Sequence, residues 1–244
     1  MSGASSGLGR ALAKHYARLD ATLGLIARRG DLLGDLAAGL SGVSIYKADV
    51  RDSGAMQAAA QDFMLRHGCP DIVIANAGIS RGTLTAHVED GEIFGDILAT
   101  NVLGMVNLFQ PFISVMRASG QGRLVGVASI AGYRGLPGGG AYSASKAAAI
   151  NYLESLRVEM HGSGVSVITI CPGFITTPMT ANNPFRMPFI LPAEDAAGKV
   201  VAAVENRTSF AVIPWQMAIA AGALKLLPNF LHDRLFVNAP RKPR

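Results

Sequence analysis

The stretch Gly3-Ala-Ser-Ser-Gly7-Leu-Gly9 decides the fold class. It opens a helix-length segment at 7–19. Glycines at such a helix start let the backbone approach a pyrophosphate, and the free N–H groups and the helix dipole hold its negative charge. A Gly/Ser-rich helix start without any ligand would look the same. The stretch therefore indicates a dinucleotide-binding α/β fold only if strands and helices alternate around it.

Short apolar runs and helix-length amphipathic segments do alternate along the chain. The runs are almost continuously apolar, as in parallel strands that helices cover on both faces. The prediction is one doubly wound, mostly parallel, Rossmann-like α/β domain over residues 1–244, without an internal repeat or linker. The strands are expected at 22–27, 43–47, 71–75, 123–128, 165–170 and 210–213. The helices are expected at 7–19, 31–39, 53–67, 91–116, 141–161 and 193–206.

One strand of this pattern is missing or truncated. A phosphate-binding turn of this kind follows a strand at the centre of the sheet, yet only Met1 and Ser2 precede Gly3. Without that strand its two neighbours would each lose a pairing partner and expose apolar faces. We expect either that the native chain begins upstream with an apolar strand, or that the sheet is strained and poorly stable. The intact mass of the protein from its native host distinguishes the two.

Composition limits the partners of the protein. Half of the 244 residues are hydrophobic and 16% are charged, which argues against disorder. The net charge of +5 suits an anionic ligand, but no Lys/Arg run longer than two precedes the tail Arg241-Lys-Pro-Arg244, so nucleic-acid binding is not expected. The uncharged stretch 208–224 falls short of the roughly 20 apolar residues that a spanning helix needs.

Cysteine and histidine usage predicts a reducing compartment and no metal site. Two cysteines, Cys69 and Cys171, cannot form a disulfide framework, and no signal peptide precedes the glycine motif. The five histidines show no metal-ligand spacing. We therefore expect a cytoplasmic protein.

The end of the second expected strand indicates which dinucleotide binds. A site for NAD usually places an acidic residue there, whereas a site for NADP places arginine near the 2′-phosphate. Here the strand ends Ala27-Arg28-Arg29, and guanidinium groups form charge-assisted bidentate bonds to phosphate. The sequence therefore predicts NADP, with a solvated basic loop as the alternative.

The stretch Tyr142-Ser-Ala-Ser-Lys146 is the most specific chemical signal. Its i,i+4 spacing puts both side chains on one face of a helix. A free tyrosine titrates near ~10, and an adjacent ammonium is expected to lower that pKa towards the range useful for general acid–base catalysis. An ordinary exposed Tyr/Lys pair is the alternative reading of so short a motif.

Other polar residues follow neighbouring strands. Ser129 ends the 123–128 strand, the triplet Asn76-Ala-Gly78 ends 71–75, and Pro172-Gly-Phe-Ile-Thr-Thr177 follows 165–170. Ligands of parallel sheets bind outside the carboxyl ends of the strands. We expect these residues to meet the Tyr/Lys pair at one edge.

In this order the motifs resemble the short-chain dehydrogenase/reductase family across nearly the whole chain. The resemblance implies a catalytic tetrad of Asn101, Ser129, Tyr142 and Lys146. Tyr142 would donate a proton to a carbonyl oxygen as NADPH delivers hydride to the carbon, while Ser129 orients that oxygen. Lys146 would also bond the nicotinamide ribose, and Asn101 would hold a proton-relaying water. A dinucleotide-sensing or interaction protein without turnover is the alternative on the same fold.

The resemblance also implies a set of cofactor contacts. Asp49 matches the residue that touches the adenine ring, and Thr177 the one that binds the nicotinamide carboxamide. The departures from the family pattern are Ala75, Ala128 and Ser2, none of which removes a tetrad member. The full expected set is Gly3, Ser5, Ser6, Gly7, Leu8, Gly9, Arg28, Arg29, Asp49, Val50, Asn76, Ala77, Gly78, Tyr142, Lys146, Pro172, Gly173, Ile175 and Thr177.

Two segments bear on the substrate and on assembly. The loop 174–192 carries Met179, Phe185, Met187 and Phe189, which favour a hydrophobic small-molecule substrate unless they only anchor the loop. The apolar segment 215–237 is expected to cover the substrate pocket and to pack against a second subunit in a homodimer or homotetramer. Peripheral membrane contact, with the basic tail nearby, is the alternative.

Overall fold

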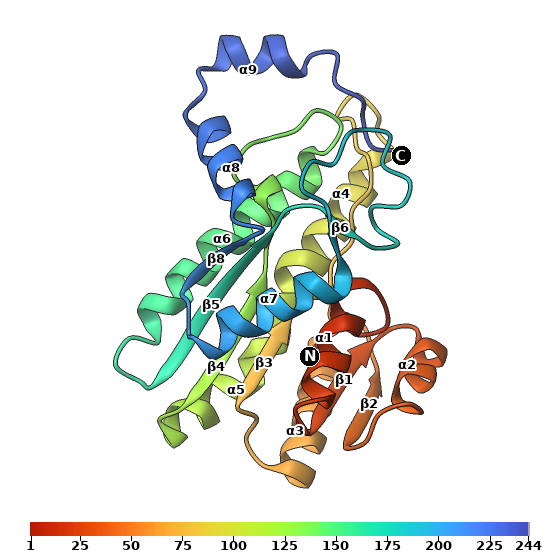
Figure 1. The fold of residues 1–244 in the computed structure, drawn as a ribbon. Helices are drawn as coiled ribbons and strands as arrows, with labels where there is room; N and C mark the ends of the chain where they lie inside the picture. The colour runs from red at the N-terminus through yellow and green to blue at the C-terminus, as the bar shows by residue number, and fades with distance from the viewer. Residues whose placement is uncertain (244) are drawn as a thin grey trace.

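The computed structural model describes residues 1–243, in which helices alternate with parallel strands (Figure 1). Arg244, the last residue of the basic tail, lies outside the described residues. The strands are β1 Leu23–Ala27, β2 Val43–Lys47, β3 Ile72–Ala75, β4 Gly122–Val127, β5 Val165–Pro172, β6 Ile175–Thr176, β7 Leu191–Pro192 and β8 Phe210–Ile213. The helices are α1 Gly7–Ala17, α2 Gly30–Ala37, α3 Ser53–His67, α4 Asp90–Leu98, the π-helical η1 Ala99–Leu103, α5 Gly104–Ser119, the 3₁₀ turn η2 Ile130–Gly132, α6 Gly140–Glu159, α7 Ala193–Glu205, α8 Gln216–Leu226 and α9 Asn229–Phe236.

The main sheet is parallel, with the strand order β3-β4-β5-β8. Its register pairs Ile72 with Arg123 at the start of β3 and β4, and Gly122 with Val165 at the start of β4 and β5. Strands β1 and β2 form a separate parallel pair, and β6 with β7 a third, minimal one. The predicted mostly parallel, Rossmann-like fold is confirmed, and the carboxyl ends of β3, β4 and β5 meet at one edge.

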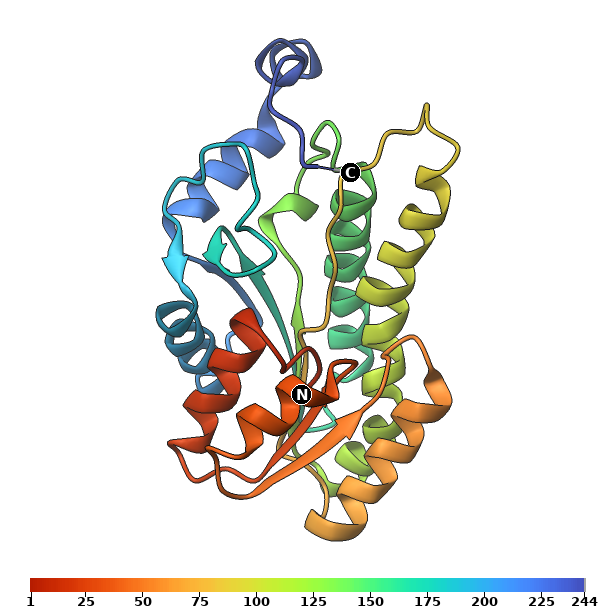
Figure 2. The ribbon, with the colours of Figure 1, turned by 90° about the vertical axis from the view of Figure 1, so that its right-hand side faces the viewer.

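Each face of the sheet has its own hydrophobic core. On β5, Ile168 and Ile170 pack on one side with α1, α2 and α7, whereas Val167 and Cys171 pack on the other with α3, α5 and α6. Figure 2 shows the two helical layers edge-on, with the strands between them. Because successive side chains of a strand point to opposite faces, strands buried on both sides need the nearly continuous apolar runs seen in the sequence.

The C-terminal apolar segment contains two helices that the sequence did not resolve. Leu227 caps α8 in an extended conformation, and Pro228 caps α9. A residue before proline is disfavoured in the helical region, so one apolar segment becomes two helices at this point. The expected single helix at 91–116 is in turn divided by the π-helical η1.

The place of the missing strand is occupied only by Met1 and Ser2. Ser2 forms a one-residue parallel bridge with Ile26 of β1, and its N–H donates to the carbonyl of Ile74 in β3 at 2.9 Å. Among the described residues, β1 and β3 do not pair with each other directly. The pair β1-β2 and the main sheet β3-β4-β5-β8 are therefore separate sheets. The expected loss of pairing partners is therefore visible in the structure.

A cavity of about 410 Å³ lies where that strand would continue. The amino group of Met1 is buried beside it and donates to the carbonyl of Gly24. The cavity has both apolar and polar lining residues, so the poor environment for a charge comes from the burial of the amino group itself. The lining includes Leu23, Ile26, Met56, Phe63, Ile72, Val73, Ile74, Leu108 and Phe112.

We expect a chain that begins at Met1 to gain stability as the pH rises from about 5 to 8. Burial lowers the pKa of the Met1 amino group from 8.0 to about 5, so between these values the unfolded chain binds the proton and the folded chain does not. The free energy of unfolding should therefore rise with pH, by on the order of 4 kcal/mol at most. Urea unfolding across this range measures it, with retention of Met1 verified by intact mass.

The matched control for this prediction is the same chain with an acetylated amino terminus. Acetylation removes the titrating group while all carboxylates and histidines remain, so the difference between the two pH profiles isolates the amino group. Identical pH slopes for the free and the acetylated chains would contradict the prediction.

One helical run is long and apolar enough to cross a membrane by length and composition. It is Asp90–Ser119, with a mean hydropathy of 1.3 over its most apolar window. Leu108, Phe109 and Phe112 on this run are buried in the core beneath the sheet. The run therefore serves as one of the covering helices of the sheet.

Candidate active site

The predicted catalytic residues gather at the carboxyl edge of the main sheet. Ser129 follows β4 and caps η2, with its Oγ accepting from the Ala131 N–H at 3.1 Å. Helix α6 begins at Gly140, so Tyr142 lies in its first turn and Lys146 lies one turn later. The fold thus brings Ser129, Tyr142 and Lys146 together from two elements.

Polar contacts hold these three side chains in one cluster. The Ser129 hydroxyl lies close enough to the Tyr142 phenol to lower the phenol's pKa, although burial has the larger and opposite effect. The ammonium of Lys146 lies 5.7 Å from the centre of the Tyr142 ring and donates to the carbonyl of Val127 at 2.8 Å. The Ser129 hydroxyl also lies 3.4 Å from the Pro172 carbonyl, which ties the cluster to the end of β5.

The pKa of the Tyr142 phenol is shifted in the direction opposite to the one expected from its lysine neighbour, and the pKa of Lys146 is shifted as well. Burial raises the pKa of the Tyr142 phenol, and the hydrogen bond from Ser129 works in the opposite direction without reversing it. Burial lowers the pKa of Lys146 to about 8. The expectation that the ammonium gives Tyr142 a lowered pKa is therefore wrong for this geometry, because desolvation of the phenol dominates. The phenol is protonated at neutral pH, which is the form that donates.

Asn101 holds the loop after β3 against α6. Its side chain accepts from the Ile79 N–H at 2.8 Å and donates to the Ile79 carbonyl at 3.0 Å and to the Ser145 hydroxyl at 2.9 Å. It lies in η1, the π-helical stretch between α4 and α5, and such stretches are frequent at functional sites. A Cβ on Gly78 would lie 3.2 Å from the Asn101 Oδ1 and 3.6 Å from the Lys146 Nζ. Asn101 and Lys146 therefore flank the same loop.

Ser145 is a site residue that the sequence did not single out. Its hydroxyl donates to the Tyr142 carbonyl at 2.7 Å and receives the Asn101 amide. Its place within the Tyr142–Lys146 motif was visible, but its connection to Asn101 depends on the packing of η1 against α6.

The glycine turn is built onto the loop after β3. A Cβ on Gly3, which has a φ of +66°, would lie 2.8 Å from the Ala77 Cα, and a Cβ on Gly9 would lie 2.2 Å from the Gly3 carbonyl oxygen. The Ser2 hydroxyl accepts from the N–H groups of Asn76 and Ala77. These glycines are therefore needed for close packing within the protein, besides the approach to a ligand that the sequence predicted.

The start of α1 suits a diphosphate. The helix begins at Gly7, and its N-cap residue Ser6 makes no side-chain capping bond. No acidic residue lies in the first turn, so N–H groups and the helix dipole face a place free of negative charge. The turn 3–9 could therefore hold the pyrophosphate of a dinucleotide, with Ser5 and Leu8 within it.

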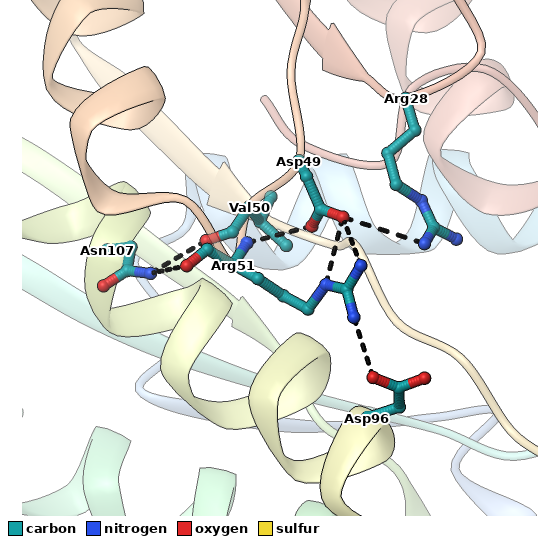
Figure 3. A network of polar contacts seen from close by, with 6 residues as sticks. All are labelled: Arg28, Asp49, Val50, Arg51, Asp96 and Asn107. Atoms are coloured by element: carbon teal, nitrogen blue, oxygen red, sulfur yellow. Dashed lines mark hydrogen bonds and ion pairs between the residues drawn. The ribbon is translucent and has the colours of Figure 1, made fainter. Parts of the chain in front are cut away.

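The two predicted phosphate-binding arginines point in different directions. The Arg29 guanidinium donates to the hydroxyls of Ser5 at 3.0 Å and Ser6 at 2.7 Å. Arg28 instead lies 3.8 Å from the carboxylate of Asp49 (Figure 3). Arg29 thus borders the diphosphate turn, and Arg28 borders the place expected for adenosine.

Arg51 joins this group and was missed in the sequence. Its guanidinium binds the Asp49 carboxylate at 2.8 Å and the Asp96 carboxylate at 2.7 Å (Figure 3). Burial raises the pKa of the Asp49 carboxyl, but the hydrogen bonds and charge of Arg51, with the charge of Arg28, outweigh it and the net pKa is lowered. Asp49 is therefore an ion-paired carboxylate, which its expected contact with adenine does not require. No local motif identifies Arg51, since its second partner comes from α4.

Other residues predicted to contact the cofactor have buried side chains or main-chain groups that hydrogen-bond within the protein. The Val50 side chain is buried in the core, and its carbonyl accepts from the Asn107 amide at 2.9 Å. Ile175 is also buried in the core, and its carbonyl accepts from the Thr180 hydroxyl at 2.6 Å. The N–H of Gly173 donates to the carbonyl of Ile213, which fixes the turn after Pro172.

Thr177 lies next to the glycine turn. A Cβ on Gly7 would lie 3.1 Å from the Thr177 side chain. The main chain of Thr177 is fixed by the Thr180 hydroxyl, which accepts its N–H at 3.1 Å. The loop after β6 therefore reaches the predicted cofactor site.

The chain is similar to known oxidoreductases over most of its length. A family model described as short chain dehydrogenase matches residues 1–186. An uncharacterized oxidoreductase of Myxococcus xanthus is 39% identical over 241 residues, which cover 96% of this chain and 93% of that protein. The chain belongs to the short-chain dehydrogenase family. Its enzyme class is thereby a dehydrogenase or reductase that acts on CH–OH or C=O groups.

Further members of the short-chain dehydrogenase family carry more specific names. The ketoacyl reductase HetN of Nostoc is 32% identical over 222 residues, covering 87% of this chain and 77% of that protein. A short-chain dehydrogenase from Burkholderia cenocepacia, solved in complex with NADP, is 28% identical with a TM-score of 0.83, covering 96% of this chain and 94% of that one. A Burkholderia phymatum structure in complex with NAD, 23% identical with a TM-score of 0.82, shares the fold over 100% of this chain and 96% of that one.

In this short-chain dehydrogenase, several side chains of the loop 174–192, which was predicted to contact the substrate, pack against one another. The rings of Phe174 and Phe185 lie 6.2 Å apart, and the Met187 sulfur receives the amide of Asn183. This supports the anchoring alternative for these residues. Met179 and Phe189 are instead exposed.

In the apolar C-terminal segment, α8 packs next to β8 and buries Met217 and Ala221, whereas α9 stands away from the sheet (Figure 1). Arg134 fixes the segment by donating to the carbonyls of Leu224 and Leu227 and to the Asn229 side chain. Helix α9 has no buried residue. The exposed apolar residues of the segment include Trp215, Ile219, Leu226, Phe230, Leu235 and Val237.

Within residues 1–243, no group of three or more His, Cys, Asp and Glu side chains could hold a metal ion.

Proposed function

We propose that this short-chain dehydrogenase reduces the carbonyl carbon of a hydrophobic small molecule with NADPH. The observation that carries the proposal is the cluster of Ser129, Tyr142 and Lys146 at the carboxyl edge of the sheet. Bound NADPH would supply the hydride, which goes to the carbonyl carbon, and leave as NADP⁺.

Tyr142 is the proton donor in this proposal. Its phenol is half-buried and protonated, because burial raises its pKa, and it lies near the Ser129 hydroxyl. A carbonyl oxygen between Ser129 and Tyr142 would receive a hydrogen bond from each, so the charge that develops on oxygen is stabilised before the proton moves. The O–H bond of Tyr142 breaks as the O–H bond of the alcohol forms.

In this proposal Lys146 returns a proton to Tyr142 after each turnover, and Asn101 holds the segment that carries Tyr142 in place. The Lys146 pKa of about 8 leaves the amine largely protonated at neutral pH and able to exchange a proton. Asn101 positions the loop after β3 and, through Ser145, the first turn of α6. The proton-relaying water at Asn101 that the family resemblance implies remains part of the proposal.

The basic residues around the adenosine end support NADPH rather than NADH. Arg28 and Arg29 follow β1, where an acidic residue would favour NAD. Solved relatives carry either NAD or NADP, so the preference rests on the residues of this chain. A 2′-phosphate between Arg28, Arg29 and Arg51 would join a cluster in which these three arginines outnumber the two carboxylates paired with them.

The substrate side of the proposal rests on the loop 174–192. Met179 and Phe189 expose apolar surface there. The name ketoacyl reductase of the Nostoc relative fits a carbonyl on an apolar chain. NADPH oxidation against a panel of aliphatic ketones, aldehydes and quinones tests the function, and no turnover across the whole panel would reject it.

Alanine at Arg28 and at Arg29 should each raise the KM for NADPH about tenfold, and together they should reverse the cofactor preference. Each replacement removes a charge-assisted bond to the 2′-phosphate, which NADH lacks, so the KM for NADH should change little. Steady-state kinetics with both cofactors measures the effect. Arg18→Ala, at the far end of α1, is the matched control. An unchanged ratio of the two KM values in the double variant would contradict the assignment.

The remaining proposals concern location and assembly. We propose a cytoplasmic location and a homodimer or homotetramer that buries the exposed apolar side chains of α8 and α9. Peripheral membrane contact through the same side chains is the alternative, and recovery of a monodisperse oligomer without detergent would count against it.

A further inference from the structure

The C-terminal tail, defined as residues 237–243, returns from α9 to the candidate active site (Figures 1 and 2). The Lys242 ammonium donates to the Ser80 hydroxyl at 3.0 Å and to the Met179 carbonyl at 3.2 Å. Ser80 follows shortly after Gly78, and Met179 shortly after Thr177. Lys242 therefore links the two loops that carry residues of the predicted nicotinamide site.

Two glycines receive the tail. The Gly82 N–H donates to the Pro243 carbonyl at 2.9 Å, and a Cβ on Gly82 would lie 2.2 Å from the Lys242 carbonyl oxygen. Gly138, with a φ of +72°, would bring a Cβ to 2.9 Å from the Arg241 Cβ. A side chain at Gly82 would push the tail away, so the tail has a defined seat on these loops.

The Lys242 ammonium has hydrogen-bonding capacity left over. It carries three N–H donors, of which two have acceptors, and no carboxylate within residues 1–243 forms an ion pair with it. The Ser80 hydroxyl accepts from Lys242, and its own proton has no acceptor in that part of the chain. Burial lowers the pKa of Lys242, as expected for a half-buried cation without a counter-charge.

We propose that Lys242 and Ser80 bind a carboxylate of the substrate, so that the enzyme prefers carbonyl compounds with a free acid group on an apolar chain. One ammonium N–H and one hydroxyl match the two oxygens and the single charge of a carboxylate. The cofactor's phosphates do not compete, because their predicted sites are the turn 3–9 and the arginines after β1. This inference rests on the proposed carbonyl reduction and names its substrate class.

The test compares methyl ketones that carry a carboxylate with the methyl esters of the same acids. Suitable pairs are 4-oxopentanoate, 5-oxohexanoate and 7-oxooctanoate with their esters, which vary the distance from carbonyl to acid. The wild type should have the higher kcat/KM for at least one acid over its ester. Lys242→Met should lower kcat/KM for that acid by about 10- to 100-fold and leave the ester within about threefold. Equal losses on both would mean that Lys242 only pins the tail, and this would overturn the proposal.

Two further variants separate the charge from the seat of the tail. Gly82→Ala keeps the Lys242 side chain but displaces the tail that carries it. This variant should therefore show the same selective loss of kcat/KM for the acid. Lys199→Met removes an exposed ammonium on α7 and should change neither substrate. Wild-type enzyme that reduces the esters with no preference for any acid would reject this inference and leave the proposed function standing. Failure to reduce any ketone of either series or of the general panel would reject both.

Discussion

Replacement of Tyr142 by phenylalanine should lower kcat for carbonyl reduction by about 10²- to 10⁴-fold, the range that general acid catalysis contributes. The variant removes one oxygen and leaves the ring on which the Lys146 ammonium lies. The raised pKa keeps the phenol protonated, so its loss removes the proton donor beside Ser129. Single-turnover oxidation of NADPH measures the loss in the chemical step.

Binding of NADPH to the Tyr142→Phe variant should stay within about threefold of the wild type, because the lost hydroxyl group is expected to act on the substrate oxygen. Tyr152→Phe is the matched control, since it removes a phenol from the same helix and should leave kcat unchanged. Turnover of the Tyr142→Phe variant at the wild-type rate would remove Tyr142 from the mechanism.

Replacement of Lys146 by methionine should lower kcat by about 10²-fold and also weaken NADPH binding by about tenfold. The ammonium is buried, donates to the Val127 carbonyl and lies over the Tyr142 ring, so its loss removes the positive charge from the whole cluster. In the wild type, Lys146 has a pKa of about 8. Reduction should therefore slow as the pH rises through about 8, and the variant should lack that limb.

Cofactor fluorescence titration and the pH profile of kcat separate this role from a structural one. The methionine leaves the buried Val127 carbonyl without its donor, so thermal unfolding checks that the fold is retained. The Tyr142→Phe/Lys146→Met double variant should be about as slow as the single tyrosine variant, because residues that act as a unit are not additive. A pH profile with the same upper limb in the Lys146→Met variant would contradict the role of Lys146.

The fold and the position of the catalytic cluster could be predicted from the sequence because both depend on local patterns. Strands buried on both faces are apolar almost throughout. All six expected strands agree with the structure to within two residues at each end, and 43–47 and 210–213 have the same bounds as β2 and β8. The i,i+4 spacing of Tyr142 and Lys146 fixes their common helix face. The lack of a full strand before Gly3 was also expected, because only Met1 and Ser2 precede the glycine turn.

The protonation states and pairings at the site could not be predicted in this way. The Tyr142 pKa is raised because the desolvation of its phenol outweighs the other influences, and desolvation depends on every segment packed around it. Arg28 and Arg29 are adjacent in the chain yet serve different partners, and Arg51 reaches Asp49 and Asp96 from a position without any motif.

The amino-acid sequence by itself determined the parallel sheet, its catalytic edge and the family, since each follows from residues close together in the chain. Only the tertiary structure decided which charges are paired, which phenol has a raised pKa and where the tail lies. Lys242 meets Ser80 across 162 positions of sequence. No local pattern encodes such a contact, because it depends on how α8 and α9 return the chain to the loop after β3.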